Sequence, residues 1–293
     1  MSVVNTPVLS QPYMAMSREL RASVEQFFAR AEPEQSVLVV DSCGPVITSQ
    51  FQILQAIGLE RLSRMKEVHA FSGGAFALFV YIGLASGAGR ICPTQLSTPE
   101  NERRFREFHH PSSVPVARVL LNLLTGHTVF GSAKPVHDSM RYMLQNEFVD
   151  TPFDLMPANL HLHLHDRQAG RSIELSRATL TTPDRASLGE LPMLDVISLC
   201  VSIPRVYGDD GRYGDPVYAR DHRDHIKNVC ANGAPTLVST PWRTGTKDAI
   251  TFVKCTASRY PKAALMSDML RMIFNVRNRD WQRYASAAFQ FPG

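Results

Sequence analysis

One serine in this chain stands where a nucleophile could be held. Ser72 lies in the stretch His69-Ala70-Phe71-Ser72-Gly73-Gly74, between two apolar runs. The run at 68–71 has the length of a buried strand, and the run at 75–84 has the length of a buried helix. A serine on a sharp turn from strand to helix presents its hydroxyl as a nucleophile, and glycines let the backbone bend there. By itself, the same pattern is also typical of an ordinary tight turn.

Two other loops carry groups that could act with Ser72. The loop Asp41-Ser42-Cys43-Gly44 follows a β-branched run at 37–40, and its backbone N–H groups could hold an anion. The glycine-rich turn Tyr213-Gly214-Asp215-Pro216 carries an acid. These loops lie far apart in the sequence, so only the fold could bring them together.

The elements around these loops alternate between strands and helices. Strands at 37–40 and 68–71 are preceded or followed by helices at 17–31, 50–65 and 75–84. Such alternation predicts a three-layer α/β/α fold with a mostly parallel central sheet. We expect residues 1–35 to form an N-terminal leader and helix, and 36–293 to form one domain. The remaining predicted elements are helices at 138–148 and 261–277, a hairpin of 159–165 with 172–175, an apolar segment at 194–201 and a strand at 250–254.

Three motifs follow one another in a fixed order. The first motif is Asp41-Ser42-Cys43-Gly44 followed by Ile53-Leu54-Gln55-Ala56-Ile57. The second motif is Ala70-Phe71-Ser72-Gly73-Gly74. The third motif is Ser202-Ile203-Pro204 followed by Asp210-Gly211 and Asp215-Pro216. In this order the chain resembles the patatin-like phospholipase and acyl hydrolase family. The motifs of that family read D-G-G-G before I-L-Q-A-L, then G-x-S-x-G, then S-I-P before D-G and D-G-G. The resemblance covers roughly residues 36–260, and the ordered set is more specific than any single motif.

The resemblance implies a serine–aspartate dyad. Ser72 would attack an acyl carbonyl, and Asp215 would take its proton and later activate water. Burial beside an apolar pocket would raise the pKa of Asp215 and make it a better base. The oxyanion hole would comprise Ser42, Cys43 and Gly44, and the nucleophile elbow Ala70, Gly73 and Gly74. The implied reaction is hydrolysis of a carboxylic ester of a phospholipid, a lysophospholipid or a related lipid, with no metal and no cofactor.

The chain departs from the family pattern at several positions. Ser42 and Cys43 replace glycines, Val46 replaces an arginine, Ala70 replaces the first glycine of the elbow, and Pro216 replaces the glycine after the acid. Proline has no N–H, so Pro216 removes a donor that could orient the carboxylate. Because of these departures, the chain could also be a catalytically inactive binding protein. Because a serine nucleophile does not specify the leaving group, it could also be a thioesterase or acyltransferase that acts on a carrier-bound acyl chain.

Other residue patterns offer rival sites. His222 or His225 could complete a Ser–His–Asp triad, although their charged surroundings are more typical of a solvated surface helix. His161, His163 and His165 alternate along a strand and could bind zinc, although the exposed face of an edge strand is the simpler interpretation. Asp209 and Asp210 compete with Asp215 for the role of base, and the spacing from Ser202-Ile203-Pro204 favours Asp215.

Composition narrows the class of protein. The chain has 293 residues, a formal net charge of +4 and no block of Lys and Arg typical of nucleic-acid binding. Its five cysteines are scattered and contain no Cys-x-x-Cys pair, which is typical of reduced thiols. We expect a cytoplasmic protein with a lipid or acyl-ester substrate and no nucleic-acid partner. An apolar stripe at 265–274 leaves transient contact with a membrane surface open as an alternative to core packing.

Overall fold

The computed structural model describes residues 18–43, 47–92, 100, 104, 117, 121, 124–125, 133–203, 211–240 and 244–254, without the side chains of 47–49 and 183–184. The predicted leader at 1–16, the helix at 261–277, Gly44, Asp209 and Asp210 lie outside these residues, as does most of the segment 87–135.

A single sheet organises the described residues. Its strands are β1 (Val37–Val40), β2 (Glu67–Phe71), β3 (Leu160–Asp166), β4 (Arg171–Leu175), β5 (Tyr213–Gly214), β6 (Thr236–Thr240), β7 (Gly245–Lys247) and β8 (Ile250–Lys254). They are ordered β4-β3-β2-β1-β6-β8-β7, and β5 pairs with β3 beside this path. The pairs β1–β2, β1–β6, β2–β3 and β6–β8 are parallel, whereas the outer pairs are antiparallel.

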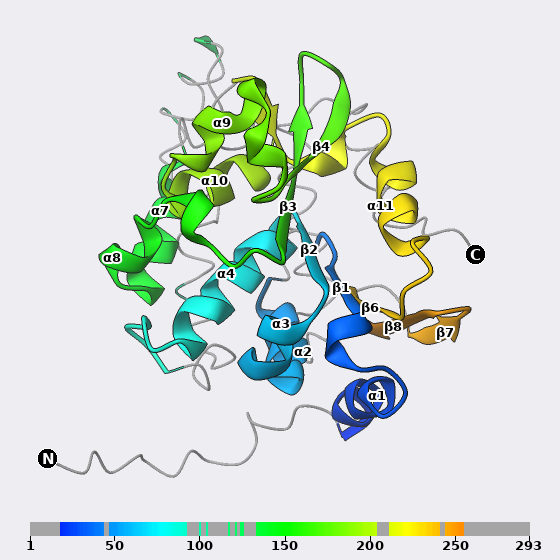
Figure 1. The fold of residues 1–293 in the computed structure, drawn as a ribbon. Helices are drawn as coiled ribbons and strands as arrows, with labels where there is room; N and C mark the ends of the chain where they lie inside the picture. The colour runs from blue at the N-terminus through cyan, green and yellow to red at the C-terminus, as the bar shows by residue number, and fades with distance from the viewer. Residues whose placement is uncertain are drawn as a thin grey trace, which may run out of the picture.

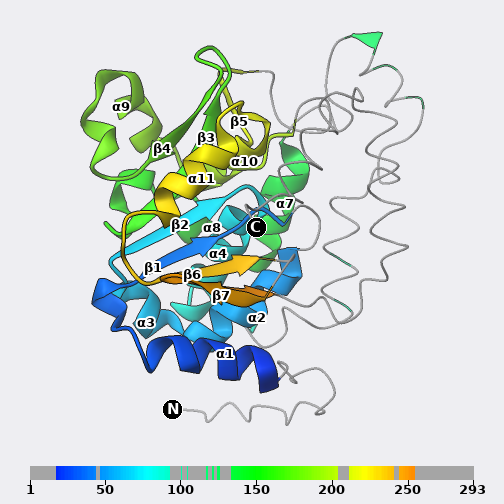
Figure 2. The same cartoon turned by 90° about the vertical axis from the view of Figure 1, so that its right-hand side faces the viewer.

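Helices cover both faces of the sheet. Figure 1 shows α4, α7 and α10 on one side of the strands and α11 on the other, and Figure 2 shows α11 crossing in front of the sheet. The described helices are α1 (Arg18–Phe28), α2 (Ile47–Ile57), α3 (Leu59–Arg64), α4 (Gly73–Ala85), α7 (Lys134–Met143), α8 (Asn146–Val149), α9 (Pro183–Gly189), α10 (Met193–Cys200) and α11 (His222–Cys230). The predicted three-layer α/β/α fold with a mostly parallel sheet is thereby confirmed.

The apolar residues of β1 explain why the sheet is buried on both faces. All four are fully buried, and because side chains alternate along a strand, they divide between two clusters. Leu38 and Val40 belong to the main core with α2, α4 and α10, whereas Val37 and Val39 pack with Ile226 of α11. The predicted N-terminal helix also belongs to the main core, since Leu20, Val24 and Phe27 of α1 are part of that cluster.

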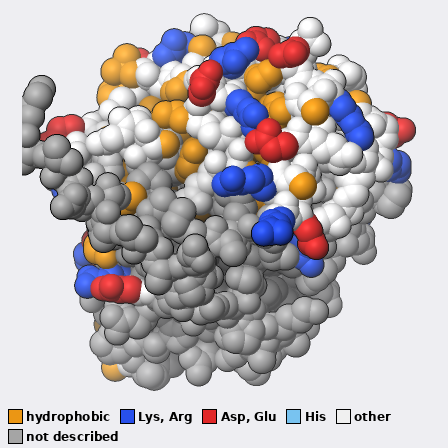
Figure 3. Space-filling model, turned by 90° about the horizontal axis from the view of Figure 1, so that it is seen from below, with side chains coloured by type: hydrophobic (Ala, Val, Ile, Leu, Met, Phe, Trp, Pro, Cys, Tyr) orange, Lys and Arg blue, Asp and Glu red, His pale blue; other side chains and the backbone are white. Residues whose placement is uncertain are grey.

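Charged side chains of both signs share the outer surface. Figure 3 shows basic and acidic side chains interspersed over the described part of the face seen from below. Two ion pairs tie α3 to the N-terminal segment: Arg61 lies 2.9 Å from Glu25, and Arg64 lies 2.7 Å from Glu34. Pairs this exposed contribute little to stability.

Some predicted elements differ from those observed. The helix expected at 50–65 is two helices, because Gly58 adopts a φ of 82° between α2 and α3. The helix expected at 138–148 begins earlier and is interrupted between α7 and α8. The histidine-rich strand β3 lies inside the sheet, between β2 and β4, so its interpretation as an edge strand was wrong. The central strand β6 was missed, although its Thr-Leu-Val-Ser-Thr sequence is rich in β-branched residues.

Candidate active site

Ser72 lies on a strained turn between β2 and α4. Its backbone has φ 50° and ψ −129°, and Ser72 is one of two non-glycine residues with a positive φ among those the structure describes. Such a conformation costs on the order of 1–3 kcal/mol and persists where the surroundings impose it. The turn places the hydroxyl at the carboxyl end of β2 and at the N-terminus of a helix, as in a nucleophile elbow.

Gly74 shows what imposes the turn. A Cβ atom at this position would lie 2.4 Å from the carbonyl oxygen of Val40 and 2.6 Å from that of Asp41. Any larger residue would therefore push α4 away from the end of β1. The predicted elbow residues are consistent with this packing, since Ala70 at the end of β2 is fully buried and Gly73 begins α4. Glycine at 74 is required by the close approach of α4 to β1.

The fold brings Asp215 to Ser72 across 143 residues of sequence. The Ser72 hydroxyl donates a hydrogen bond of 2.5 Å to Oδ2 of Asp215. The other carboxylate oxygen, Oδ1, accepts a hydrogen bond of 3.0 Å from the backbone N–H of Val217. The donor that Pro216 lacks is thus supplied one residue later, and Pro216 occupies the first position of a short 3-10 helix, where a missing N–H is tolerated.

Burial makes Asp215 a better base than a free carboxyl. The residue is 1% exposed, and loss of hydration raises the pKa of Asp215 to about 7, against the lowering effects of the Ser72 and Val217 hydrogen bonds and of the Arg167 charge. A carboxyl with this pKa is ionised in a large fraction of molecules at neutral pH and can accept a proton there. The buried Cys200 is close enough that the Asp215 charge adds to the effect of burial in raising the pKa of its thiol.

The end of β3 positions the loop that carries Asp215. The short strand β5 pairs with β3, and the backbone N–H of Asp215 donates to the carbonyl oxygen of Ser202 at 3.1 Å. The Arg167 guanidinium lies against Gly214, where a Cβ would be 2.5 Å from Nη2, and it donates to the carbonyl oxygen of Gly211 at 3.1 Å. Arg167 was not singled out from the sequence, because no local pattern links it to Asp215.

A buried polar network fixes the loop after β1. Asp41 accepts hydrogen bonds on Oδ1 from the Ser42 N–H at 2.7 Å and on Oδ2 from the Thr240 hydroxyl at 2.9 Å. Gln50 of α2 donates to the carbonyl oxygen of Asp41 at 3.1 Å and accepts a hydrogen bond from the Ser239 hydroxyl. Asp41 therefore shapes the loop and joins β1 to β6.

This network changes the predicted oxyanion hole. The Ser42 N–H is already bound to Asp41, so in this geometry it does not point at a substrate. Cys43 is buried in the main core, and Gly44 lies outside the described residues. The first hydrogen bonds of α4 run from the backbone N–H groups of Ala75 and Phe76 to the carbonyl oxygen of Ser72. The backbone N–H groups that come before Ala75 therefore have no acceptor within the helix. An oxyanion formed at Ser72 would also face the positive end of the helix dipole.

The rival sites are placed differently. His222 is 3% exposed and His225 is partly buried, and both rings lie edge-on to Phe71, so their interpretation as solvated residues was wrong. Neither replaces Asp215, because the carboxylate bonds directly to Ser72. His163 is fully buried, which also contradicts the expectation of an exposed histidine face.

The comparisons with known proteins do not assign this site. The chain matches no model of a known protein family and no curated protein. The function must therefore be inferred from the residues and their geometry.

Proposed function

We propose that this chain is a serine acyl hydrolase that cleaves carboxylic esters of phospholipids, lysophospholipids or related lipids with a Ser72–Asp215 dyad. The observation that carries the proposal is the 2.5 Å hydrogen bond from the Ser72 hydroxyl to Asp215, at a strained turn between strand and helix. A buried carboxylate that contacts a hydroxyl at such a turn is the arrangement that activates a serine.

In the reaction, the Asp215 carboxylate accepts the Ser72 proton as Oγ bonds to the carbonyl carbon of the ester. The carbonyl electrons move to oxygen, and the oxyanion is stabilised by backbone N–H groups and the N-terminus of α4. When the tetrahedral intermediate collapses, the bond to the leaving alcohol breaks and Asp215 returns the proton to that oxygen. Water then attacks the acyl-Ser72 ester, with Asp215 again as base, and releases the acid and the free serine.

The choice of a lipid ester rests on the ordered motifs that resemble the patatin-like family. The dyad geometry supports acyl transfer and leaves the leaving group open, which keeps a thioester or another acyl acceptor as alternatives. Within the described part of the chain, no helix is long and apolar enough to cross a membrane. We propose a cytoplasmic location with transient contact to a lipid surface.

A fluorophosphonate probe tests the proposal directly, because it labels only an activated serine. We expect the wild-type chain to be labelled and Ser72→Ala to be unlabelled. Ser63→Ala is the matched control, since Ser63 is exposed on α3 and should leave labelling unchanged. Absence of labelling in folded wild-type protein would overturn the proposal that this chain is an enzyme and would favour a binding protein.

A panel of acyl donors tests the substrate class. Phospholipid, lysophospholipid, neutral ester and thioester are each offered, and the acyl-Ser72 intermediate is detected by mass spectrometry of the intact chain. We expect acylation by the phospholipid or lysophospholipid. Acylation by the thioester alone would overturn the lipid-ester assignment and leave the Ser72 nucleophile in place.

A further inference from the structure

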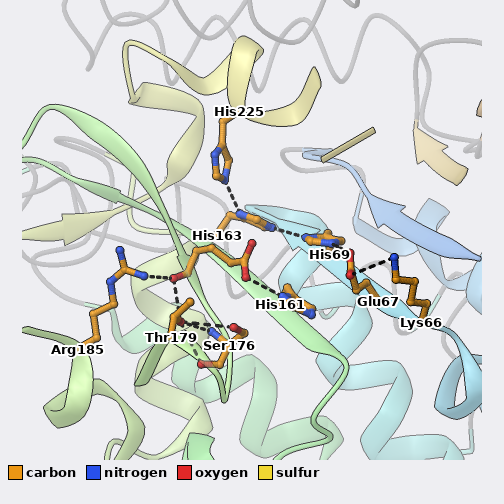
Figure 4. Close-up of polar contacts among 10 residues, drawn as sticks. Lys66, Glu67, His69, His161, His163, Ser176, Thr179, Arg185 and His225 are labelled. Carbon is orange, nitrogen blue, oxygen red and sulfur yellow. Dashed lines mark hydrogen bonds and ion pairs between the residues drawn. The ribbon is translucent and has the colours of Figure 1, made fainter. Parts of the chain in front are cut away.

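A second cluster of chemically reactive side chains lies on the face of the sheet that α11 covers. It draws His69 from β2, His163 from β3 and Glu174 from β4, which are adjacent strands. One ligand atom from each residue lies within 4.8 Å of the others. Figure 4 shows His225, His163, His69 and Glu67 joined in one series of polar contacts, with the ring of His161 beside them. The proposed acyl hydrolase mechanism uses none of these groups.

The two inner nitrogen atoms of this cluster face each other. Nδ1 of His69 lies 3.0 Å from Nε2 of His163. The nitrogen ligands of a tetrahedral Zn²⁺, each about 2.0–2.1 Å from the ion, lie about 3.3 Å apart. A metal ion would therefore replace the hydrogen bond between these two nitrogen atoms and move them apart by a few tenths of an ångström.

Each of the three groups also has an outer partner of the kind that metal ligands require. Nε2 of His69 lies 3.2 Å from Oε2 of Glu67, and Nδ1 of His163 lies 2.7 Å from Nε2 of His225. Donation from Nε2 of His69 to Glu67 leaves a lone pair on Nδ1 of His69. A metal ion would also require His163 to donate from Nδ1 to His225, so that Nε2 of His163 carries a lone pair. In metal sites, such outer partners fix the ring orientation and the tautomer.

The third group is oriented in the same way. Oε1 of Glu174 lies 2.8 Å from Nδ1 of His161, whose ring stacks on His69 with centroids 4.6 Å apart. A carboxylate oxygen and two imidazoles form a donor set that suits Zn²⁺ and related ions.

The two histidines lie inside the sheet. His163 is fully buried and His69 is 3% exposed, so a metal ion held between them would be shielded from bulk water. Neutral imidazole is the form that binds metal.

We propose that His69, His163 and Glu174 form a binding site for a divalent transition metal ion, with Zn²⁺ as the best fit. Three protein ligands leave a fourth position for water. The ion would join β2, β3 and β4 close to the nucleophile turn, since the ring of Phe71, next to Ser72, stacks on His163 with centroids 4.0 Å apart. None of these three ligands belongs to the Ser72–Asp215 dyad.

Metal titration of the full chain tests the site. The protein is stripped with a chelator, checked by circular dichroism and titrated with Zn²⁺ or with Co²⁺, whose visible absorption reports coordination geometry. We expect one equivalent of metal to bind, with the intense absorption of tetrahedral Co²⁺ and a higher melting temperature. Folded wild-type protein that binds no stoichiometric metal would overturn the proposal and leave a hydrogen-bonded histidine network.

Variants separate this site from adventitious binding. Glu174→Gln replaces the carboxylate ligand with a neutral amide at a half-buried position. This change should weaken metal binding by more than about 100-fold. Glu67→Gln replaces the carboxylate beside Nε2 of His69 with a neutral amide and should weaken metal binding by about 10–100-fold. His165→Gln is the matched control, because His165 lies on β3 outside the cluster.

The pattern across these variants decides the outcome. Unchanged affinity in both glutamate variants, or equal losses in His165→Gln, would place the metal elsewhere and refute the assignment. If Glu174→Gln does not fold, Glu67→Gln and the wild-type Co²⁺ spectrum still decide it. A spectrum of octahedral Co²⁺ in the wild-type protein would likewise contradict this ligand set.

Discussion

Replacing Asp215 by asparagine should stabilise the protein while it abolishes turnover. Burial raises the pKa of Asp215 from an ordinary value of 3.8 to about 7. Between these two values the unfolded chain has lost the proton and the folded chain has kept it, so the free energy of unfolding falls as the pH rises. The loss levels off above the folded pKa. The contribution of Asp215 to stability is thus greatest below pH 3.8 and lowest above about pH 7.

The magnitude follows from the two pKa values. Each pKa unit corresponds to about 1.36 kcal/mol, and between pH 5 and pH 8 the wild-type chain should lose roughly 2.5 kcal/mol through this group. The asparagine side chain of Asp215→Asn would carry no charge at any of these pH values. Its amide oxygen can still accept from Val217 and its amide N–H can donate to Ser72, so the packing is retained. The free energy of unfolding of Asp215→Asn, relative to that of the wild type, should therefore rise by roughly 2.5 kcal/mol from pH 5 to pH 8.

Urea unfolding at several pH values measures the difference. The matched control is Asp154→Asn, because Asp154 is exposed and lies outside the site. In parallel, kcat of Asp215→Asn should fall by about 10²–10⁴, the usual contribution of a general base. If the difference in the free energy of unfolding stays the same between pH 5 and pH 8, the inference that burial raises the pKa of Asp215 is refuted. If Asp215→Asn retains turnover, Asp215 is not the base of the mechanism.

Three further predictions concern the same site. The kcat/KM of the wild-type chain should rise with pH through an apparent pKa near 7, since Asp215 must be ionised to act as base; a flat profile between pH 5 and 8 would contradict this. Gly74→Ala should destabilise the fold by about 1–3 kcal/mol in urea unfolding, because its Cβ would lie 2.4 Å from the Val40 carbonyl oxygen. Gly211→Ala is its control, since nothing lies within 4 Å of a Cβ there, and equal effects of the two would argue against close packing of α4 on β1. Gln50→Leu should cost about 1–3 kcal/mol, measured by thermal unfolding, because it leaves buried groups without partners; a neutral effect would show that this network is not needed.

Local patterns predicted much of the scaffold. The β-branched run at β1, the strand before Ser72 and the apolar helix after it follow from residue type and spacing, and each is present. The break at Gly58 and the interruption after α7 were missed, because apolar periodicity continues across both. Strand β6 was missed because only Leu237 and Val238 of its five residues are apolar, so it lacks the continuous apolar run that marks β1.

The histidines show where sequence reasoning fails. Alternation along β3 correctly placed His161, His163 and His165 on one face. Whether that face meets water depends on the order of strands in the sheet and on α11, and neither is encoded within the strand. Placing β3 between β2 and β4 buried His163 and brought it to His69 and His225, residues distant in sequence.

The sequence by itself determined the chemistry that is available. It supplied a serine on a turn from strand to helix, an acid in a glycine-rich turn and an α/β alternation, because these depend on neighbouring residues. The tertiary structure alone decided which groups meet and in what state. It joined Ser72 to Asp215 across 143 residues of sequence, and Thr240 to Asp41 across 199. It also buried Asp215, and the pKa of a carboxyl is set by the water it loses, which only the packed chain can remove.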